Sequence, residues 1–443
     1  MAYTPRKRRF KLNYKIVVPL LVLLIFIAYF LVNFINKSNE EQQVLFTVCD
    51  FSSEKTKTTL EKEYKDVTEV KDYLFYGESL GIYQDPYKGE NSDGFNAKTI
   101  KLKSVCGDEE YSFLMDSAAD RKILLGNLEP GFYEMYIVED LKERRLYMSD
   151  EVDISTTTVT RNGKNKKVQL LADTKLLNDY DVTTNYAYAY LSVSETKLKE
   201  DEYDVVIDPA ANDSGITGGY GSTAGSSGNG LTEATESYIA AELLKTKLEE
   251  KGLKVLILRG EDEVISTYGE DGRIAKAYEV NAKYYFRLGF SSDETSPSLN
   301  GFNIFHSSHS TGMLASQIGY DLPKNTGKNL VGDTIHMRSG DSTQGVISSG
   351  VNAGDIDGRE VYDSDLYIRE SGGKATQAGM YSENSQEGTA SFSKDNLYGI
   401  NTLNIYFCYF SNSDNATYWK NSKETIVDSV ANSIAVYLDL DTE

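Results

Sequence analysis

Cysteine is scarce in this chain, with only Cys49, Cys106 and Cys408 among its 443 residues. So few cysteines exclude the disulfide framework that holds small secreted domains together. A bridge between Cys49 and Cys106 would suit an exported domain, and buried free thiols are equally compatible with the sequence. The cysteine pattern therefore leaves the pairing open.

Histidine is just as rare, and the 3 histidines are His306, His309 and His336. The stretch "HSSH" has a spacing that zinc ligands use, but no cysteine and no second histidine pair lies near it. A structural zinc site needs four such ligands, so these residues fit ordinary surface or core histidines. We therefore predict no metal site at this position.

Basic residues are too few to balance the acidic ones, because 46 Lys and Arg face 67 Asp and Glu, for a formal net charge of −21. The first 37 residues hold seven basic residues and no acidic one, which leaves −28 on the remainder. Such a surface repels phosphate backbones. Nucleic acid is therefore excluded as a partner.

Long apolar runs are absent except near the N-terminus, where residues 16–35 contain Asn33 as the only strongly polar residue. A run of this length spans a bilayer as a helix. Because basic residues precede it, we predict a cytoplasmic basic tail at 1–15, a transmembrane signal anchor at 16–36, and the rest of the chain outside the cell membrane. A cleaved signal peptide is the alternative, but "NFINKSNEEQ" contains no small-x-small cleavage site.

Residues 43–180 contain short runs rich in β-forming residues, such as "TIKLKSV", "FYEMYIVED" and "KKVQLLA", separated by turn-prone stretches such as "TRNGKNKK". This alternation is typical of a small antiparallel all-β sandwich. The phrase "LLGNLEPGFYEMYIVED" resembles the last strands of Ig-like or carboxypeptidase-regulatory-like modules. That resemblance implies a fold and no activity.

The pattern changes near residue 200. "YDVVIDP" predicts a buried strand, "TEATESYIAAELLKTKLEEKG" an amphipathic helix, and "LKVLILR" a second strand. A strand, a crossover helix and a strand form a βαβ unit with a parallel sheet. Further strand and helix patterns follow up to a C-terminal helix in "KETIVDSVANSIAVYLDL". Residues 200–443 are therefore predicted to form an α/β domain with a mostly parallel sheet flanked by helices.

Two other motifs in this half are weak. "DIDGRE", with Asp355 and Asp357, lacks the third carboxylate and the terminal glutamate of a calcium loop, so we interpret it as a turn. "SGITGGYGSTAGSSGNG" has no Gly-Lys-Ser ending, which excludes a phosphate-binding loop of that type.

The order of these elements resembles the zinc-dependent N-acetylmuramoyl-L-alanine amidases, which cut the amide between the glycan lactyl group and the stem peptide of peptidoglycan. "IDPAAND" keeps Asp208 and Pro209 of the family's Asp-Pro-Gly-His-Gly-Gly, Glu233 precedes its helix at the family's spacing, and Arg273 begins the next helix. "YYFRLGFSSD" and "NGFNIF" follow in step, and "NIYFCYFSN" stands where the family has Val-Glu-x-Gly-Phe-x-Ser-Asn. The resemblance covers roughly residues 203–440 and implies an amidase-like fold.

The resemblance also implies a zinc ion held by two histidines and a glutamate, with a second glutamate as general base. In this sequence the two histidine positions are Ala211 and Gly289, the general-base position is Tyr406, and only Glu233 is retained. One carboxylate cannot hold zinc against water, and without the metal nothing lowers the pKa of the attacking water. We therefore predict no zinc, no catalytic residue, and a smaller, drier cleft that Tyr406 partly fills.

The predicted ligand-binding cleft combines the retained and the altered family positions. We expect the remaining acidic side chains to lie together on a hydrated rim of this cleft. The cleft residues are Asp208, Ala211, Asp213, Glu233, Gly289 and Tyr406.

Three functions remain open from the sequence. The preferred one is a membrane-anchored pseudoamidase that binds peptidoglycan stem peptides or a cell-wall or division partner without cutting. The second is an active amidase with an unrecognised metal arrangement, which metal content and release of muropeptides would reveal. The third is a structural exterior protein of a division or sporulation complex in a Gram-positive cell, which absence of muropeptide binding would favour.

Overall fold

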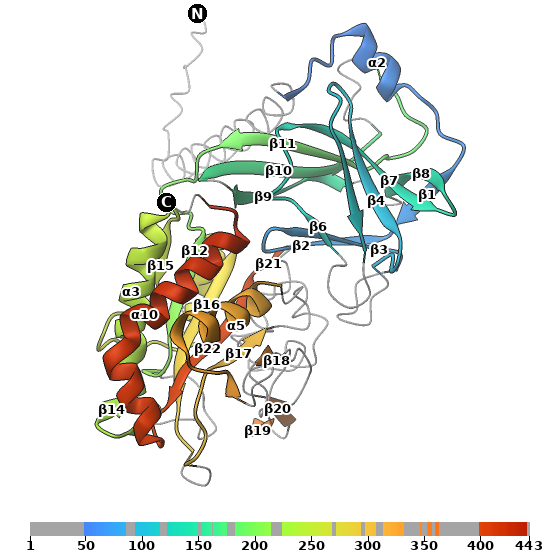
Figure 1. Ribbon diagram of the computed structural model, residues 1–443. Helices are drawn as coiled ribbons and strands as arrows, with labels where there is room; N and C mark the ends of the chain where they lie inside the picture. Colours follow the sequence, from blue (N-terminus) through green and yellow to red (C-terminus); the bar gives the residue numbers. More distant parts are fainter. Residues whose placement is uncertain are drawn as a thin grey trace, which may run out of the picture.

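The computed structural model describes residues 48–440, except for several internal stretches (Figure 1). Those stretches are 86–93, 116–121, 149–151, 162, 175–181, 214–223, 268–271, 294–296, 307–312, 332–345, 348–351, 357–358 and 363–397. Among the described residues, no helix is long and apolar enough to cross a membrane. The predicted tail at 1–15 and anchor at 16–36 lie outside the described residues.

The N-terminal half consists of two sheets packed face to face. The larger sheet has eight strands and the smaller has four. Apolar side chains from both sheets form one core, for example Phe75 and Ile82 of the smaller sheet with Leu102 and Met135 of the larger. The larger sheet contains β1 (Val67–Val70), β4 (Thr99–Ser104), β5 (Glu110–Leu114), β7 (Gly131–Glu139), β8 (Lys142–Met148), β9 (Val152–Arg161), β10 (Lys164–Ala172) and β11 (Tyr190–Thr196). The smaller contains β2 (Asp72–Tyr76), β3 (Ser79–Tyr83), β6 (Lys122–Leu124) and β21 (Tyr398–Gly399).

The larger sheet departs from the sequence prediction in two ways. It continues past residue 180, because β11 pairs antiparallel with both β10 and β7. Pairing is antiparallel throughout except for β1, which runs parallel to β8. Both features depend on pairing between distant segments, which short-range patterns do not specify.

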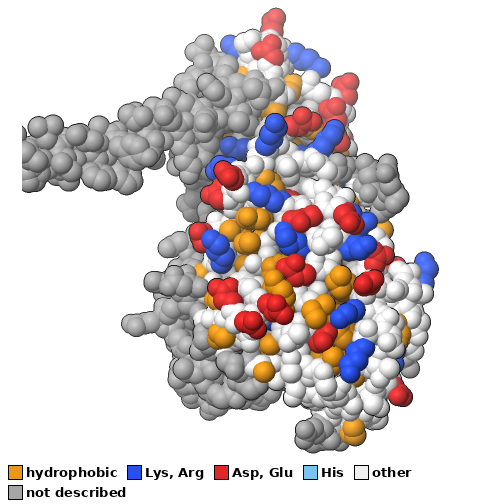
Figure 2. All heavy atoms as spheres, turned by 90° about the vertical axis from the view of Figure 1, so that its left-hand side faces the viewer, with side chains coloured by type: hydrophobic (Ala, Val, Ile, Leu, Met, Phe, Trp, Pro, Cys, Tyr) orange, Lys and Arg blue, Asp and Glu red, His pale blue; other side chains and the backbone are white. Residues whose placement is uncertain are grey.

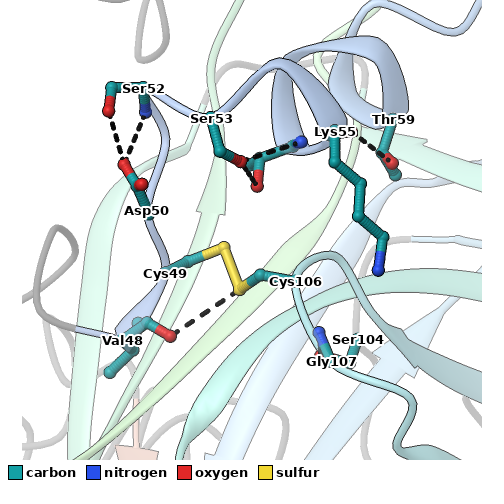
Figure 3. Close-up of a disulfide and its surroundings, with 11 residues drawn as sticks. Val48, Cys49, Asp50, Ser52, Ser53, Lys55, Thr59, Ser104, Cys106 and Gly107 are labelled. Atoms are coloured by element: carbon teal, nitrogen blue, oxygen red, sulfur yellow. Dashed lines mark hydrogen bonds between the residues drawn. A yellow bond between two sulfur atoms is a disulfide. The ribbon is translucent and has the colours of Figure 1, made fainter.

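Cys49 and Cys106 form a disulfide in the structure (Figure 3). The bridge joins the segment before helix α2 (Glu54–Leu60) to the loop that follows β4. Ser53 caps this helix, because its side chain accepts a hydrogen bond from the Thr56 amide at 3.2 Å. Cys408 is a buried free thiol, and burial raises its pKa.

The C-terminal half is an α/β domain built on a six-stranded sheet in the order β15-β12-β16-β22-β17-β18. The first four of these strands run parallel, and β17 is antiparallel to β22. A mostly parallel sheet agrees with the sequence prediction. The strands are β12 (Val205–Pro209), β15 (Val255–Ile257), β16 (Tyr284–Ser291), β17 (Asn303–His306), β18 (Val346–Ile347) and β22 (Asn401–Tyr409). Two short pairs lie apart from it: β13 (Ser227–Gly228) with β14 (Leu231–Thr232), and β19 (Asn352–Ile356) with β20 (Arg359–Tyr362).

Helices cover both faces of this sheet. Helices α3 (Glu233–Glu250), α5 (Met313–Thr326) and α10 (Ser413–Tyr437) pack on one face around Leu244, Ile318 and Trp419. Helix α4 (Arg273–Glu279) packs on the opposite face, where Ile274 and Ala277 contact the side chains that the strands direct to that face. Figure 2 shows the outer face of α3 and α10, where acidic, basic and apolar side chains are interspersed.

Candidate functional site

The carboxyl ends of β12, β16 and β22 bring together four positions that are far apart in the sequence. Gly289 of β16 pairs with Tyr406 of β22 across the ladder. A Cβ atom added to Gly289 would lie 3.0 Å from Tyr406 Cε1 and 3.1 Å from Glu233 Oε1. A Cβ added to Gly225 would lie 2.8 Å from the Ala211 Cβ. The structure therefore places Ala211, Glu233, Gly289 and Tyr406 around one point.

Glu233 is buried at this point, as the first residue of α3. Its Oε2 accepts a hydrogen bond from the Ser226 amide at 2.9 Å, and its Oε1 accepts one from the Phe290 amide at 3.0 Å. The N-terminus of a helix also favours a carboxylate. The side chain therefore connects the loop before α3 to the end of β16.

The groups around Glu233 do not fit a zinc ion. Zinc in proteins takes nitrogen, sulfur or carboxylate oxygen ligands, at least three of them from the protein at a catalytic site. Ala211 presents a methyl group, Gly289 has no side chain, and the ring of Tyr406 lies where a side chain at position 289 would begin. Within the described residues, no group of three His, Cys, Asp or Glu side chains could hold a metal ion.

The prediction that Asp208 lies on a hydrated rim is wrong, because its side chain is in the interior of the domain. Its side chain is 0% exposed and forms ion pairs with Arg273, at 2.7 Å, and with Arg287, at 2.5 Å. The Tyr285 hydroxyl donates a hydrogen bond to the same carboxylate at 2.7 Å. Burial opposes ionisation, yet the two guanidinium groups hold the pKa of Asp208 below its ordinary value. Asp208 is therefore a structural anion inside the domain.

Asp213 also contributes to local structure. Its carboxylate accepts hydrogen bonds from the amide and the hydroxyl of Thr267, near the start of α4. The three acidic residues expected on one rim therefore have different environments: Asp208 in the interior, Glu233 at the converging strand ends, and Asp213 against the segment before α4.

Two buried arginines hold the chain after β12 in place. Arg259 donates to the carbonyl oxygens of Pro209 and Ala210, at 3.0 and 2.9 Å. Arg273 donates to those of Ala211 and Asn212, at 2.8 and 2.7 Å. Ala211 has φ +65°, in the left-handed region that costs energy for a residue with a side chain. The arginines stabilise this turn and so fix where Ala211 points.

The roles of Arg259 and Arg287 were not predicted from the sequence. Arg287 lies within the otherwise apolar strand "YYFRLGF", and a charged residue in a buried strand requires a partner inside the protein. That composition was the available signal. Arg259 follows "LKVLIL" directly and offered no comparable one.

The remaining candidate motifs lie elsewhere. His306 is the last residue of β17, and His309 and His336 lie outside the described residues. Asp355 pairs with Glu360 in the antiparallel β19–β20 ladder, which agrees with a turn between them, while Asp357 lies outside the described residues.

No protein-family model matches the sequence, and no curated protein is significantly similar to it. Solved structures similar to this chain include the catalytic domain of CwlV, an N-acetylmuramoyl-L-alanine amidase from Bacillus (Paenibacillus) polymyxa var. colistinus. The two chains are 14% identical, the match covers 54% of this chain and 99% of that one, and the TM-score is 0.34. The amidase Ami1 from Mycobacterium smegmatis is 14% identical, and the match covers 55% of this chain and 99% of that one, with a TM-score of 0.36. The CwlD amidase from Clostridioides difficile, solved in complex with the GerS lipoprotein, is 15% identical to this chain. The match covers 54% of this chain and 100% of that one, with a TM-score of 0.32.

CwlV and Ami1 are N-acetylmuramoyl-L-alanine amidases, the family that the sequence resembles. With TM-scores below 0.5 and identities below 25%, these similarities do not by themselves assign an activity.

Proposed function

We propose that this chain is an amidase-like protein that binds peptidoglycan stem peptides, or a cell-wall partner, without cleaving them. One observation carries this proposal: both carboxylate oxygens of Glu233 accept backbone amide hydrogens, and the positions beside it are Ala211, Gly289 and Tyr406. A binding site needs shape and hydrogen-bonding groups, whereas amide hydrolysis also needs an activated water and a proton acceptor.

The tyrosine at position 406 supports binding without turnover. Tyr406 stands at the position that corresponds to the family's general base, and its ring packs edge-on against Phe305 with centroids 5.5 Å apart. A phenol in this position adds an aromatic surface with a polar tip. Such a group suits contact with a peptide or a sugar ring, and at neutral pH it is a poor proton acceptor.

We further propose that the protein is anchored in the cell membrane by residues 16–36, with the described part outside. The Cys49–Cys106 bridge supports this location, because disulfides persist in oxidising compartments and are rare in the cytosol. The net charge of −28 after residue 37 also suits a soluble exterior part.

The test is incubation of the purified full chain with peptidoglycan sacculi and zinc, scored for sedimented protein and for released stem peptides. We expect sedimentation without release. Tyr406→Ala should reduce sedimentation, whereas Tyr320→Ala, at an exposed residue of α5 (62% exposed), should not. Released peptides that disappear in Glu233→Ala would establish an active amidase, and absence of sedimentation would overturn binding to peptidoglycan.

A further inference from the structure

The N-terminal sheets contact the α/β domain at the edge of its sheet opposite to Glu233. Strands β12, β16 and β22 begin at Val205, Tyr284 and Asn401, next to the turn between β2 and β3 (Figure 1). The same strands carry the site at their other ends. From Tyr284 to Gly289 the distance along an extended strand is roughly 17 Å.

The turn between β2 and β3 fits closely against the starts of β16 and β22. Gly77 has φ +53°, and a Cβ added to it would lie 2.9 Å from the Asn401 Cβ and 3.4 Å from the Lys283 carbonyl oxygen. The Asn401 amide in turn donates to that same Lys283 carbonyl at 2.9 Å. Only glycine fits this contact, in both its conformation and its size.

A buried ion pair secures the turn from the second sheet. The Glu78 carboxylate lies 3.2 Å from the Arg161 guanidinium of β9 and accepts a hydrogen bond from the Thr160 amide at 3.2 Å. Arg161 also donates to the Tyr437 carbonyl, at the end of α10, at 2.8 Å. The hydroxyl of Thr160 donates to Asp204, directly before β12. The turn is thus held by the end of β9, and the end of β9 in turn contacts two segments of the α/β domain, the end of α10 and the residue before β12.

Backbone pairing adds a third connection. Strand β21 pairs in parallel with β2 as part of the smaller N-terminal sheet, with Phe75 opposite Tyr398 and Tyr76 opposite Gly399. The chain then passes through Ile400 directly into β22. The strand that carries Tyr406 is therefore attached to the N-terminal sheet just before it enters the α/β sheet.

We propose that the Glu78 turn and Arg161 position the strands of the site, so that the two halves form one interlocked unit rather than two independent domains on a linker. The geometry supports this because four charged side chains are almost fully buried at the contact and balance in sign. They are Glu78, Arg161, Asp204 and Lys283. Buried charges of this kind remain stable only while their partners stay in place. This positioning of the strands is independent of what the site binds.

Cleavage of the connection between the halves tests the interlock. Lys197 and Lys199 are exposed after β11, and a specific protease sequence inserted between them would let the folded full chain be cut there. The disulfide lies within the N-terminal half, so no covalent bond joins the fragments after cleavage. We expect the fragments to co-elute in size-exclusion chromatography, and to separate when Arg161→Glu is present. Separation of the unsubstituted fragments would overturn the proposal.

Trp419 reports whether the turn positions the site. It is the single tryptophan, and its ring packs on Phe290 of β16 at 4.8 Å and Phe407 of β22 at 5.2 Å. We expect Glu78→Ala to red-shift the Trp419 emission and to raise amide hydrogen exchange at 286–290 and 403–407 about tenfold or more, with Glu78→Gln showing a smaller change.

Lys98→Glu is the matched control, because Lys98 forms a part-exposed ion pair with Glu139 in the N-terminal half. It should leave both signals unchanged. If Glu78→Ala does not fold, the same two measurements are made on Glu78→Gln, with the smaller change expected for it. Unchanged emission and unchanged exchange in a folded Glu78 variant would show that the turn does not position the site.

Discussion

The ring of Tyr406 lies against Gly289, its partner across the β16–β22 ladder, so that a Cβ at position 289 would meet Tyr406 Cε1 at 3.0 Å. The two positions are therefore sterically dependent. A side chain at 289 and the tyrosine at 406 compete for the same space, beside the carboxylate of Glu233. The glycine at 289 and the tyrosine at 406 thus belong to a single packing arrangement.

This dependence predicts non-additive stabilities for Gly289→Ala and Tyr406→Ala. Gly289→Ala alone should lower the free energy of unfolding by about 1–3 kcal/mol, because it overpacks a filled space. In the double variant the alanine gains room, and the two effects should couple by about 0.5–3 kcal/mol. Urea denaturation of the four proteins measures this term. Strict additivity would show that the ring moves away without cost.

Zinc binding should require rebuilding of the whole ligand set. We expect the unsubstituted protein to lose zinc on dialysis and the triple variant Ala211→His, Gly289→His, Tyr406→Glu to retain up to one zinc ion per chain. Adding Glu233→Ala to the triple variant should abolish this retention. Metal content measured by mass spectrometry decides the outcome. Zinc retained by the unsubstituted protein would contradict the assignment of the site.

Asp208→Asn should destabilise the α/β domain strongly. The substitution leaves the buried guanidinium groups of Arg273 and Arg287 without their shared counter-charge, a change that typically costs about 3–5 kcal/mol. Asp213→Asn is the matched control, because its partner Thr267 is neutral and the expected loss is about 1 kcal/mol. Chemical denaturation compares them. Equal losses would show that the ion pairs contribute nothing beyond hydrogen bonding.

Stability should fall as the pH rises from about 4.5 to about 7. Burial, opposed in part by Arg161, raises the pKa of Glu78 from 4.5 to about 7. In this window the folded protein binds more protons than the unfolded chain, so the free energy of unfolding decreases with pH, by at most about 3 kcal/mol. The raised pKa of the buried Asp204 acts in the same direction, whereas Lys283, with a pKa lowered by burial to about 8, titrates above the window.

Denaturation at several pH values between 4.5 and 7.5 measures this slope, and Glu78→Gln should flatten it, because the amide does not titrate. A slope that Glu78→Gln leaves unchanged would assign the effect to other groups.

Removal of the disulfide should destabilise the N-terminal half. Cys49 and Cys106 are separated by 57 residues, and loss of a cross-link over such a loop costs about 4 kcal/mol in the chain-entropy model. The variant with both residues changed to serine should therefore melt earlier than the unsubstituted protein. Addition of a reducing agent should lower the melting temperature of the unsubstituted protein only. Equal melting temperatures of the serine variant and the unsubstituted protein would argue against the bridge in solution.

Much of the architecture followed from local patterns. The βαβ periodicity after residue 200 indicated an α/β domain, and alternating runs indicated sheets before it. The end of the first half at Thr196 and the parallel β1–β8 pair were missed, because strand pairing is decided by contacts between distant segments. The predicted environment of Asp208 was also wrong, because the sequence does not show which guanidinium groups a carboxylate will contact.

The sequence by itself determined which side chains stand at the four positions of the site. Ala211 and Gly289 carry no side-chain metal ligand in any fold, and the long apolar run and acidic composition are properties of the chain alone. The tertiary structure decided that these positions meet at Glu233, that Tyr406 occupies the space at Gly289, and that Glu78 is buried against the strands of the site. The physical reason is that residue type fixes what a side chain can bind, whereas long-range packing fixes what comes near it.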